Sequence, residues 1–226
     1  MIEELLPKSV VAVEAHGDDV LRGAPLYPEE EALVARAVSK RRTEFAAVRG
    51  CARRAMEKLG VPPQPVVTGQ GGAPLWPAGL VGSMTHCAGY CAAALVRATD
   101  LLSLGIDAEP HGPLPDNVGA SVLLPAELDR LGGLAGQRPD VHWDRVMFSA
   151  KESVYKSWYP LTRTWLDFTE ADITLRVEPG DDPHGTLRAE LLVPGPVVGG
   201  HRLTGFDGRW SVREGLVTTV VVVPHA

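Results

Sequence analysis

The sequence predicts a mixed α/β (α+β) protein that is built from two halves. Two long segments, Glu29 to Leu59 and His142 to Trp158, carry apolar residues at helical spacing. Several shorter segments are rich in valine or alternate between apolar and polar residues, which is typical of strands. A connector rich in proline and glycine, His111 to Gly119, lies between the two groups. We therefore expect an N-terminal half at residues 1–110 and a C-terminal half at residues 111–226.

The two long helical patterns have recognisable ends. The segment from Glu29 to Leu59 opens with three acidic residues, which suit the positive end of the helix dipole. It stops at Gly60, and Pro62 and Pro63 follow. The segment from His142 to Trp158 has a continuous apolar stripe. Each pattern predicts one helix.

The strand patterns occur in both halves, between the helices and after them. The segments that we expect to form strands are Ser9–Ala15, Cys91–Val96, Leu101–Ile106, Ile173–Val177, Leu187–Val193, Trp210–Arg213 and Leu216–Val223. We also expect an ordered loop with one short strand at Val61–Gly82, a short helix at Pro125–Leu131 and a loop at Leu134–Asp140.

The composition excludes several classes of protein. The 226 residues are 45% hydrophobic and 22% charged, which is ordinary for a globular protein, and the net charge of −6 disfavours a general nucleic-acid surface. The longest apolar stretch, Leu216–Pro224, is far shorter than a membrane span, and the first residues lack the apolar core of a secretory signal. Three cysteines are too few for a disulfide scaffold. We expect a cytoplasmic protein that binds neither nucleic acid nor membrane.

Two carboxylates meet at the end of the predicted strand Leu101–Ile106. Asp107 and Glu109 are two residues apart, so they point the same way in an extended strand, and Pro110 then ends the pairing. Like-charged carboxylates repel one another unless a cation or a proton lies between them, and oxygen ligands of this kind suit Mg²⁺. The alternative is a strand end with two solvated acids.

A third carboxylate lies on the second long helix. Glu152 and Lys156 are four residues apart and share a face. Glu152 is a candidate third Mg²⁺ ligand, and Lys156 would lie beside a transferring phosphoryl group. Lys151 lies about 100° around the helix and would reach a phosphate from the side. The alternative is an ordinary salt bridge on a solvated face.

The segment Trp76–His86 joins a glycine-rich loop to the next predicted strand. It ends in Gly82-Ser83-Met84-Thr85-His86, which offers close backbone approach at Gly82, two hydroxyls and a histidine. This set suits phosphate binding, although a buried structural histidine fits the residue types as well. A zinc site of His86 with Cys87 and Cys91 is disfavoured because it lacks a paired-cysteine motif.

Basic residues follow one face of the first long helix. Arg41 and Arg49 are eight residues apart with Phe45 between them. Two arginines on one face would bind a phosphate bidentately. The alternative is a solvated basic stripe.

Taken together, these motifs resemble the surfactin-type 4′-phosphopantetheinyl transferases. The branch that the chain resembles includes the enterobactin-synthase component and the actinobacterial transferases that serve mycolate and polyketide synthases. The resemblance extends from about Glu29 to Trp165, and more loosely to Gly208–Val212. The blocks that carry it are Arg41–Phe45, Pro74–Pro77, Gly82–His86, Gly105–Glu109 and Phe148–Lys156.

The resemblance implies a fold and an activity. The fold is a pseudo-dimer of two similar α/β halves, with the active site in the cleft between them. The activity is the Mg²⁺-dependent transfer of 4′-phosphopantetheine from coenzyme A to a serine of an apo acyl or peptidyl carrier protein, which releases adenosine 3′,5′-bisphosphate. A pseudo-dimer of this kind is expected to be a monomer. Secondary-metabolite or siderophore biosynthesis is the expected setting.

The resemblance also implies roles for individual residues. Asp107, Glu109 and Glu152 would bind Mg²⁺, with Asp107, Glu152 and Lys156 as the catalytic residues. Coenzyme A would be bound by Arg41, Arg49, Ser83, Met84, Thr85, His86, Lys151 and Lys156. Of these, Arg41, Arg49, Ser83 and His86 would contact the adenosine 3′-phosphate region, and Lys151 and Lys156 would contact the pyrophosphate. The run Thr68–Ala73 contains no basic residue, where relatives often have one. The segment Trp158–Trp165, which includes Arg163, is the candidate docking surface for the carrier, although Trp158 also fits a core position.

Two other activities use the same residues. A metal-dependent phosphohydrolase of nucleotides or coenzyme A needs the acids but no partner protein. A non-catalytic module that binds coenzyme A or a carrier protein does not need three metal carboxylates, so the acids favour catalysis.

Overall fold

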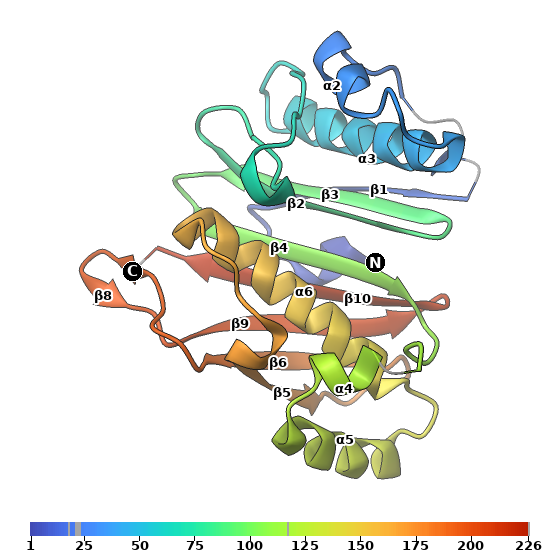
Figure 1. Cartoon of the computed structure of the whole chain (residues 1–226), viewed down its shortest axis with the longest axis vertical. Coiled ribbons are helices and arrows are strands. Elements are labelled where there is room, and N and C mark those ends of the chain that lie inside the picture. Colours follow the sequence, from blue (N-terminus) through green and yellow to red (C-terminus); the bar gives the residue numbers. More distant parts are fainter. Residues whose placement is uncertain (18, 21–23, 117, 226) are drawn as a thin grey trace.

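The computed structural model describes residues 1–17, 19, 20, 24–116 and 118–225. Two antiparallel sheets lie next to one another, and a long helix covers one face of each (Figure 1). The first sheet has the strand order β1-β3-β2 and the second has the order β4-β10-β9-β6-β5. The mixed α/β class that the sequence predicts is confirmed.

The N-terminal half places helices α2 and α3 over the three-stranded sheet (Figure 1). Its central strand β3 is buried along nearly its whole length, because α3 packs on one face through small residues such as Cys51 and Ala55. The elements of this half are η1 (Ile2–Leu5), β1 (Val11–His16), α2 (Pro28–Leu33), α3 (Ser39–Lys58), η2 (Gln70–Gly72), β2 (Leu80–Cys87) and β3 (Tyr90–Arg97).

The single helix predicted at Glu29–Leu59 is wrong, because the chain breaks between α2 and α3. Glu30 is fully buried and its carboxylate is 2.9 Å from an Arg53 guanidinium nitrogen. In one straight helix these residues would lie about 34 Å apart. The buried ion pair therefore holds α2 against the C-terminal half of α3.

The C-terminal half places α6 across the five-stranded sheet, with α4 and α5 at one end (Figure 1). Trp143 and Trp210 pack edge to face between this helix and the sheet, with ring centroids 5.2 Å apart. The elements are β4 (Leu101–Pro110), α4 (Val118–Val122), α5 (Pro125–Gln137), α6 (Trp143–Thr162), η3 (Phe168–Glu170), β5 (Ala171–Val177), β6 (His184–Leu191), β7 (Val197–Val198), β8 (His201–Arg202), β9 (Gly205–Arg213) and β10 (Leu216–Pro224).

Several predicted boundaries shift in this structure. The segment Leu80–Cys87 is the complete strand β2, where the sequence indicated only a link to the next strand. Helix α5 continues to Gln137, so most of the segment Leu134–Asp140, which was predicted to be a loop, is helical. Helix α6 continues past Trp158 to Thr162, with Pro160 inside it. Burial of its apolar side chains outweighs the cost of the proline.

The two halves repeat one device. Short helices α2 and α5 each begin with a proline, and the glutamate at their third position is fully buried. Glu30 pairs with Arg53 of α3 and accepts the Val66 N–H, while Glu127 pairs with Lys151 of α6 and accepts the Ile173 N–H. The prediction of two similar halves is thereby confirmed.

The sheets meet where β2 lies beside β4. The hydroxyl oxygens of Ser83 and Thr85 accept hydrogen bonds from the backbone N–H groups of Ile106 (3.0 Å) and Ala108 (3.1 Å). On the other side, a separate apolar cluster joins η1 to both sheets and includes Ile2, Leu104 and Val220. The two sheets are therefore joined by side-chain-to-backbone hydrogen bonds in place of the backbone-to-backbone hydrogen bonds of a continuous sheet.

Strand β4 bears on the predicted division of the chain at residue 110. It pairs with β10 along Leu101–Pro110, so by pairing it belongs to the second sheet, while its N–H groups also bond to β2. The division into residues 1–110 and 111–226 stays a prediction. Within the described ranges, no helix is both long enough and apolar enough to cross a membrane.

Gly105 sets how closely α6 approaches β4, which gives a first prediction. A Cβ there would collide with the Ser153 carbonyl oxygen and lie 2.6 Å from Ser157 Oγ. We expect Gly105→Ala to lower the free energy of unfolding by about 2–3 kcal/mol, measured by urea denaturation. Gly133→Ala is the control, because nothing lies near a Cβ at that exposed position in α5 and alanine favours a helix. Equal stabilities of the two variants would contradict the packing argument.

Candidate active site

A cavity of about 640 Å³ opens between the two halves. Its walls come from α3, the loop before β2, β2 itself and α6. It brings together the predicted site residues Arg41, Arg49, Ser83, Met84, His86, Glu152 and Lys156. Four other predicted residues, Thr85, Asp107, Glu109 and Lys151, are not part of its lining.

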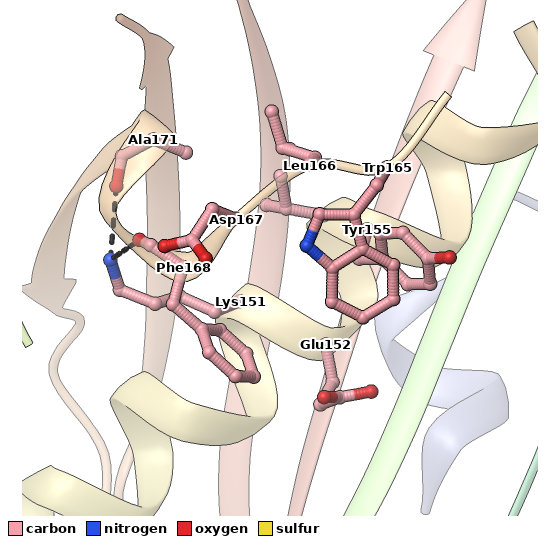
Figure 2. Close-up of a pocket in the computed structure, with 9 residues that line it drawn as sticks. Lys151, Glu152, Tyr155, Trp165, Leu166, Asp167, Phe168 and Ala171 are labelled. Carbon is pink, nitrogen blue, oxygen red and sulfur yellow. Dashed lines mark hydrogen bonds between the residues drawn. The ribbon is translucent and has the colours of Figure 1, made fainter. Parts of the chain in front are cut away.

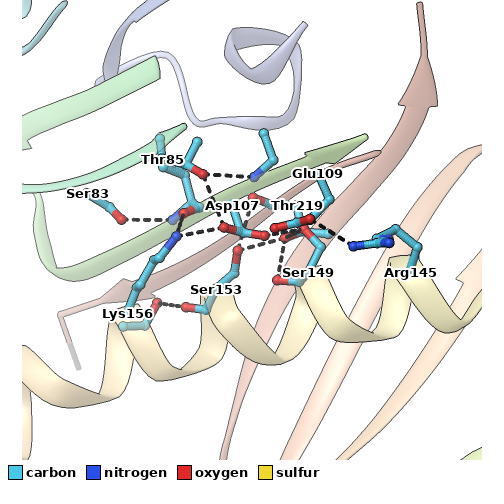
Figure 3. Close-up of polar contacts among 12 residues, drawn as sticks. Ser83, Thr85, Asp107, Glu109, Arg145, Ser149, Ser153, Lys156 and Thr219 are labelled. Carbon is cyan, nitrogen blue, oxygen red and sulfur yellow. Dashed lines mark hydrogen bonds and ion pairs between the residues drawn. The ribbon is translucent and has the colours of Figure 1, made fainter. Parts of the chain in front are cut away.

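Asp107 is outside the lining of the cavity and is held by side chains from two elements, β2 and α6 (Figure 3). Its Oδ1 accepts hydrogen bonds from Thr85 Oγ1 of β2 (3.1 Å) and from Lys156 Nζ of α6 (2.7 Å), and its Oδ2 accepts one from Ser149 Oγ (2.9 Å). The side chain is almost fully buried. A buried carboxylate needs such partners, so its orientation is fixed.

Glu109 follows two residues later on the same face of β4. Its Oε2 is 3.0 Å from Arg145 NH1 (Figure 3). The same guanidinium donates to the Gly112 and Pro113 carbonyl oxygens. Burial raises the pKa of Glu109, the negative charge of Asp107 raises it further, and Arg145 opposes both. The two carboxylates are therefore close enough to repel one another.

The sequence reasoning missed Arg145 and Ser149. Both lie on α6 on the face that carries Glu152 and Lys156, because the spacings of four, three and four residues follow the helical repeat. That spacing is a signal the sequence contained. Arg145 holds Glu109 and the connector after β4, and Ser149 orients Asp107.

Glu152 faces the cavity from the middle of α6. Within the described ranges its carboxylate makes no hydrogen bond or ion pair. Burial raises its pKa, Lys156 lowers it and Asp107 raises it, so the charges of these three side chains interact. A half-buried carboxylate without a bonded partner is free to accept a proton or to ligate a cation.

The three predicted metal carboxylates do not form a closed cage. Across the described ranges, no three His, Cys, Asp or Glu side chains stand close enough to hold a metal ion by themselves. Lys156 and Arg145 bind Asp107 and Glu109 in this structure. The donor chemistry still fits Mg²⁺, because this ion is usually bound by one or two carboxylates, waters and the substrate phosphates.

Strand β2 forms one wall of the cavity. The chain needs glycine at Gly82, because a Cβ would lie 2.8 Å from the Ala94 carbonyl oxygen and 3.1 Å from the Trp76 ring. Trp76 Nε1 donates to the Gly82 carbonyl oxygen (2.9 Å). Ser83 and Met84 line the cavity. The hydroxyls of Ser83 and Thr85 both face β4, and that of Thr85 also donates to Asp107.

Three basic side chains of the N-terminal half, Arg41, Arg49 and His86, line the cavity. Arg41 donates to His86 Nε2, and burial together with the Arg41 charge lowers the pKa of His86. The Arg49 guanidinium stacks 3.1 Å from the Phe45 ring centroid and donates to the Val66 carbonyl oxygen. Burial lowers the pKa of Arg49 to about 10, so it stays charged at neutral pH. Arginines fixed in this way suit a bound phosphate.

Lys151 does not face the large cavity. Its Nζ is 2.9 Å from a carboxylate oxygen of Glu127 and donates to the Phe168 and Ala171 carbonyl oxygens. Figure 2 shows the bonds to Phe168 and Ala171 beside a smaller cavity of about 110 Å³, which Lys151, Tyr155 and other residues line. Lys151 lies on the face of α6 that packs against β5, so in this structure it binds C-terminal elements where the sequence suggested a pyrophosphate contact.

The cavity is lined by positively charged side chains and by Glu152, and Asp107 and Glu109 lie outside its lining. Such an arrangement is typical of an enzyme that acts on phosphate groups. Residues 29–96 match the 4′-phosphopantetheinyl transferase N-terminal domain, and residues 103–192 match the 4′-phosphopantetheinyl transferase superfamily. Together these matches span both halves of the fold and the cavity between them.

Three curated relatives align with nearly the whole chain. It is 58% identical to 4′-phosphopantetheinyl transferase Svp of Streptomyces mobaraensis, over 99% of this chain and 89% of that protein. It is 46% identical to 4′-phosphopantetheinyl transferase Npt of Nocardia iowensis, over 98% and 99%. It is 47% identical to 4′-phosphopantetheinyl transferase PptT of Mycobacterium tuberculosis, over 89% and 87%.

The chain therefore belongs to the 4′-phosphopantetheinyl transferase superfamily. The family, the branch and the enzyme class that the sequence predicted are confirmed. Family membership favours the transferase over a phosphohydrolase or a non-catalytic binding protein, and the assay described below distinguishes the three.

The buried pair of Lys151 and Glu127 gives a second prediction. Their side chains are 2% and 0% exposed, so removing the lysine leaves an uncompensated buried charge. We expect Lys151→Met to lower the free energy of unfolding by about 3 kcal/mol in urea denaturation. The exposed Lys40→Met, at the start of α3, is the control and should change it little. A stable Lys151→Met protein that binds coenzyme A weakly would restore the role first suggested by the sequence.

His86 gives a third prediction, on pH. Its folded-state pKa lies below the ordinary value of 6.5. Below pH 6.5 the unfolded chain therefore binds a proton that the folded chain excludes, and stability falls as pH falls. We expect His86→Asn to show a shallower loss of stability than the parent between pH 7.5 and 5.5, measured by urea midpoints. Parallel pH profiles would contradict the lowered pKa.

Proposed function

We propose that the chain transfers 4′-phosphopantetheine from coenzyme A to a serine of an apo acyl or peptidyl carrier protein. The observation that carries this is the large cavity, which is lined both by arginines from α3 and by Glu152 and Lys156 from α6. Such a lining suits a substrate that carries more than one phosphate. Family membership supplies the chemistry of the transfer.

The reaction moves one phosphoryl group. The carrier serine Oγ forms a bond to the phosphorus that bears the pantetheine arm, and the bond from that phosphorus to the bridging pyrophosphate oxygen breaks. Adenosine 3′,5′-bisphosphate leaves, and the serine loses its proton. Catalysis of this type depends on positioning and on charge stabilisation.

Glu152 is the proposed base. Its carboxylate lines the cavity, has no bonded partner among the described residues, and has a raised pKa that favours proton uptake. Lys156 would stabilise the charge on the leaving phosphate, since its Nζ lies between Asp107 and the Ile106 carbonyl oxygen. Asp107 positions that lysine.

Mg²⁺ would be held by Asp107, Glu109 and Glu152 together with the pyrophosphate. When bound, it supplies positive charge that neutralises the phosphates. Glu109 contributes from the edge of the site, where Arg145 holds it. Thr85 acts on the site through Asp107, because its hydroxyl donates to that carboxylate.

The nucleotide end of coenzyme A would lie against α3 and β2. Arg41 and Arg49 offer the charge, Ser83 and His86 offer polar contacts, and Met84 offers an apolar wall. This grip does not involve Lys151.

The carrier would dock where α6 ends. Trp158 is buried and donates to the Thr164 carbonyl oxygen, so of the two interpretations of Trp158 the core position fits. Trp165 is 69% exposed at the edge of the small cavity and is the proposed apolar contact for the carrier. We further propose a cytoplasmic monomer, because one chain supplies both walls of the cavity and its three cysteines are free thiols.

One assay tests the proposed function directly. The protein is incubated with coenzyme A, Mg²⁺ and an apo carrier protein, and the intact carrier is weighed by mass spectrometry. A phosphopantetheinyl gain on serine supports the transferase. Breakdown of coenzyme A with an unchanged carrier would point to a phosphohydrolase, and an absence of chemistry would point to a binding module.

The carboxylates give a fourth prediction. We expect Asp107→Asn and Glu152→Gln each to slow transfer by about a hundredfold or more, because the charge that orients Lys156 and the proposed base are lost. Glu190→Gln, on the exposed face of β6, is the control and should keep parental activity. Circular dichroism checks that all variants are folded. Near-parental transfer by either active-site variant would sink the metal and base assignments.

A further inference from the structure

Arg163 is a cavity residue whose charge is not engaged. Of the described residues that line the large cavity, four are positively charged and one, Glu152, is negatively charged. Lys156 pairs with Asp107, Arg49 bonds to the Val66 carbonyl oxygen, and Arg41 bonds to His86. The Arg163 guanidinium is exposed and makes no hydrogen bond or ion pair with another described residue. It is therefore available to an anion that enters the cavity.

The backbone of Arg163 is unusual for its residue type. It caps the C-terminus of α6 in the left-handed conformation, with φ 57° and ψ 23°. Glycine is the common residue at such a cap, because a Cβ makes the left-handed region costly. Among the described residues other than glycine, Glu214 alone shares a positive φ. Strained positions of this kind are often retained for what the side chain does.

Arg163 lines the same cavity as the loop Thr68–Ala73, which has no charged residue. Tyr159 is one helical turn before Arg163, and the Arg163 N–H donates to the Tyr159 carbonyl oxygen. The Tyr159 hydroxyl donates to the Gln70 carbonyl oxygen (2.8 Å), and a Cβ on Gly71 would lie 2.6 Å from that hydroxyl. Tyr159 thus fixes the loop against the end of α6, where the unpaired guanidinium is.

The position along α6 decides which anion Arg163 can meet. Arg163 is seven residues beyond Lys156, which corresponds to about 10 Å along a helix. The reacting pyrophosphate would lie near Lys156 and the carboxylates, so a second phosphate of the same molecule is the better match. Coenzyme A has one, on the 3′ position of its ribose.

We propose that Arg163 binds the ribose 3′-phosphate of coenzyme A, in a loop region that supplies no charge of its own. This inference rests on the proposed transferase function. It assigns the arginine to the substrate and separates it from the neighbouring Trp165, which is assigned to the carrier.

The test uses Arg163→Gly, which removes the side chain and suits the left-handed backbone. Glu214→Gly is the matched control, because it makes the same backbone change in the turn between β9 and β10. The dissociation constants of coenzyme A and of 3′-dephospho-coenzyme A are measured by calorimetry on the folded proteins. The KM values for coenzyme A and for the apo carrier are measured in the mass-based assay.

We expect Arg163→Gly to weaken coenzyme A binding by about tenfold, since a charge-assisted hydrogen bond is lost. The dissociation constant of 3′-dephospho-coenzyme A and the KM for the carrier should stay the same. The midpoint of unfolding should be unchanged or slightly higher. Arg163→Lys should retain most of the affinity.

Three results would overturn the proposal. These are unchanged coenzyme A binding by Arg163→Gly, an equal loss of binding for the dephospho compound, or a raised KM for the carrier with constant coenzyme A affinity. If the parent protein neither binds coenzyme A nor modifies the carrier, that result would instead refute the proposed function, and with it the proposal for Arg163.

Discussion

The arrangement of the site depends on how the carboxylate of Asp107 is held. Its partners come from β2, through Thr85, and from α6, through Ser149 and Lys156, while Asp107 itself is on β4. A buried carboxylate must satisfy its oxygens, so these three elements are required to meet at one point. Because β2 belongs to one sheet and β4 to the other, the site forms only when both halves are folded against each other.

Each half supplies its part of the site by the same construction. A buried glutamate at the third position of a short helix ties that helix to the long helix, through Arg53 in the first half and Lys151 in the second. The long helices then present different faces to the cavity. Helix α3 presents arginines and helix α6 presents a carboxylate and a lysine, so two similar scaffolds carry unlike chemistry.

The sequence predicted the elements more reliably than their ends and contacts. The apolar periodicity of α6 and the valine-rich strands were recognisable because packing depends on local patterns. The break between α2 and α3 depends on an ion pair between residues 23 positions apart, and no local pattern reports such a pair. The extension of α6 through Pro160 likewise depends on tertiary burial.

The site residues divide in the same way. Spacing on one strand and one helix placed Asp107, Glu109, Glu152 and Lys156 in one region, and it contained the signal for Arg145. Spacing could not reveal that Lys151 turns to Glu127, because adjacent helix residues face different neighbours. It also could not reveal that the hydroxyl of Thr85 serves Asp107 and the β4 backbone together.

The hydroxyls of Ser83 and Thr85 have a consequence for how the chain avoids aggregation. Strands β2 and β4 are each the last strand of a sheet, and an uncovered last strand offers its backbone N–H groups to any passing chain. Here the side chains of one edge occupy the donors of the other, at Ile106 and Ala108. Each half therefore covers the edge strand of the other. If the two halves were separated, β2 and β4 would both become exposed edge strands that could pair with other chains and aggregate.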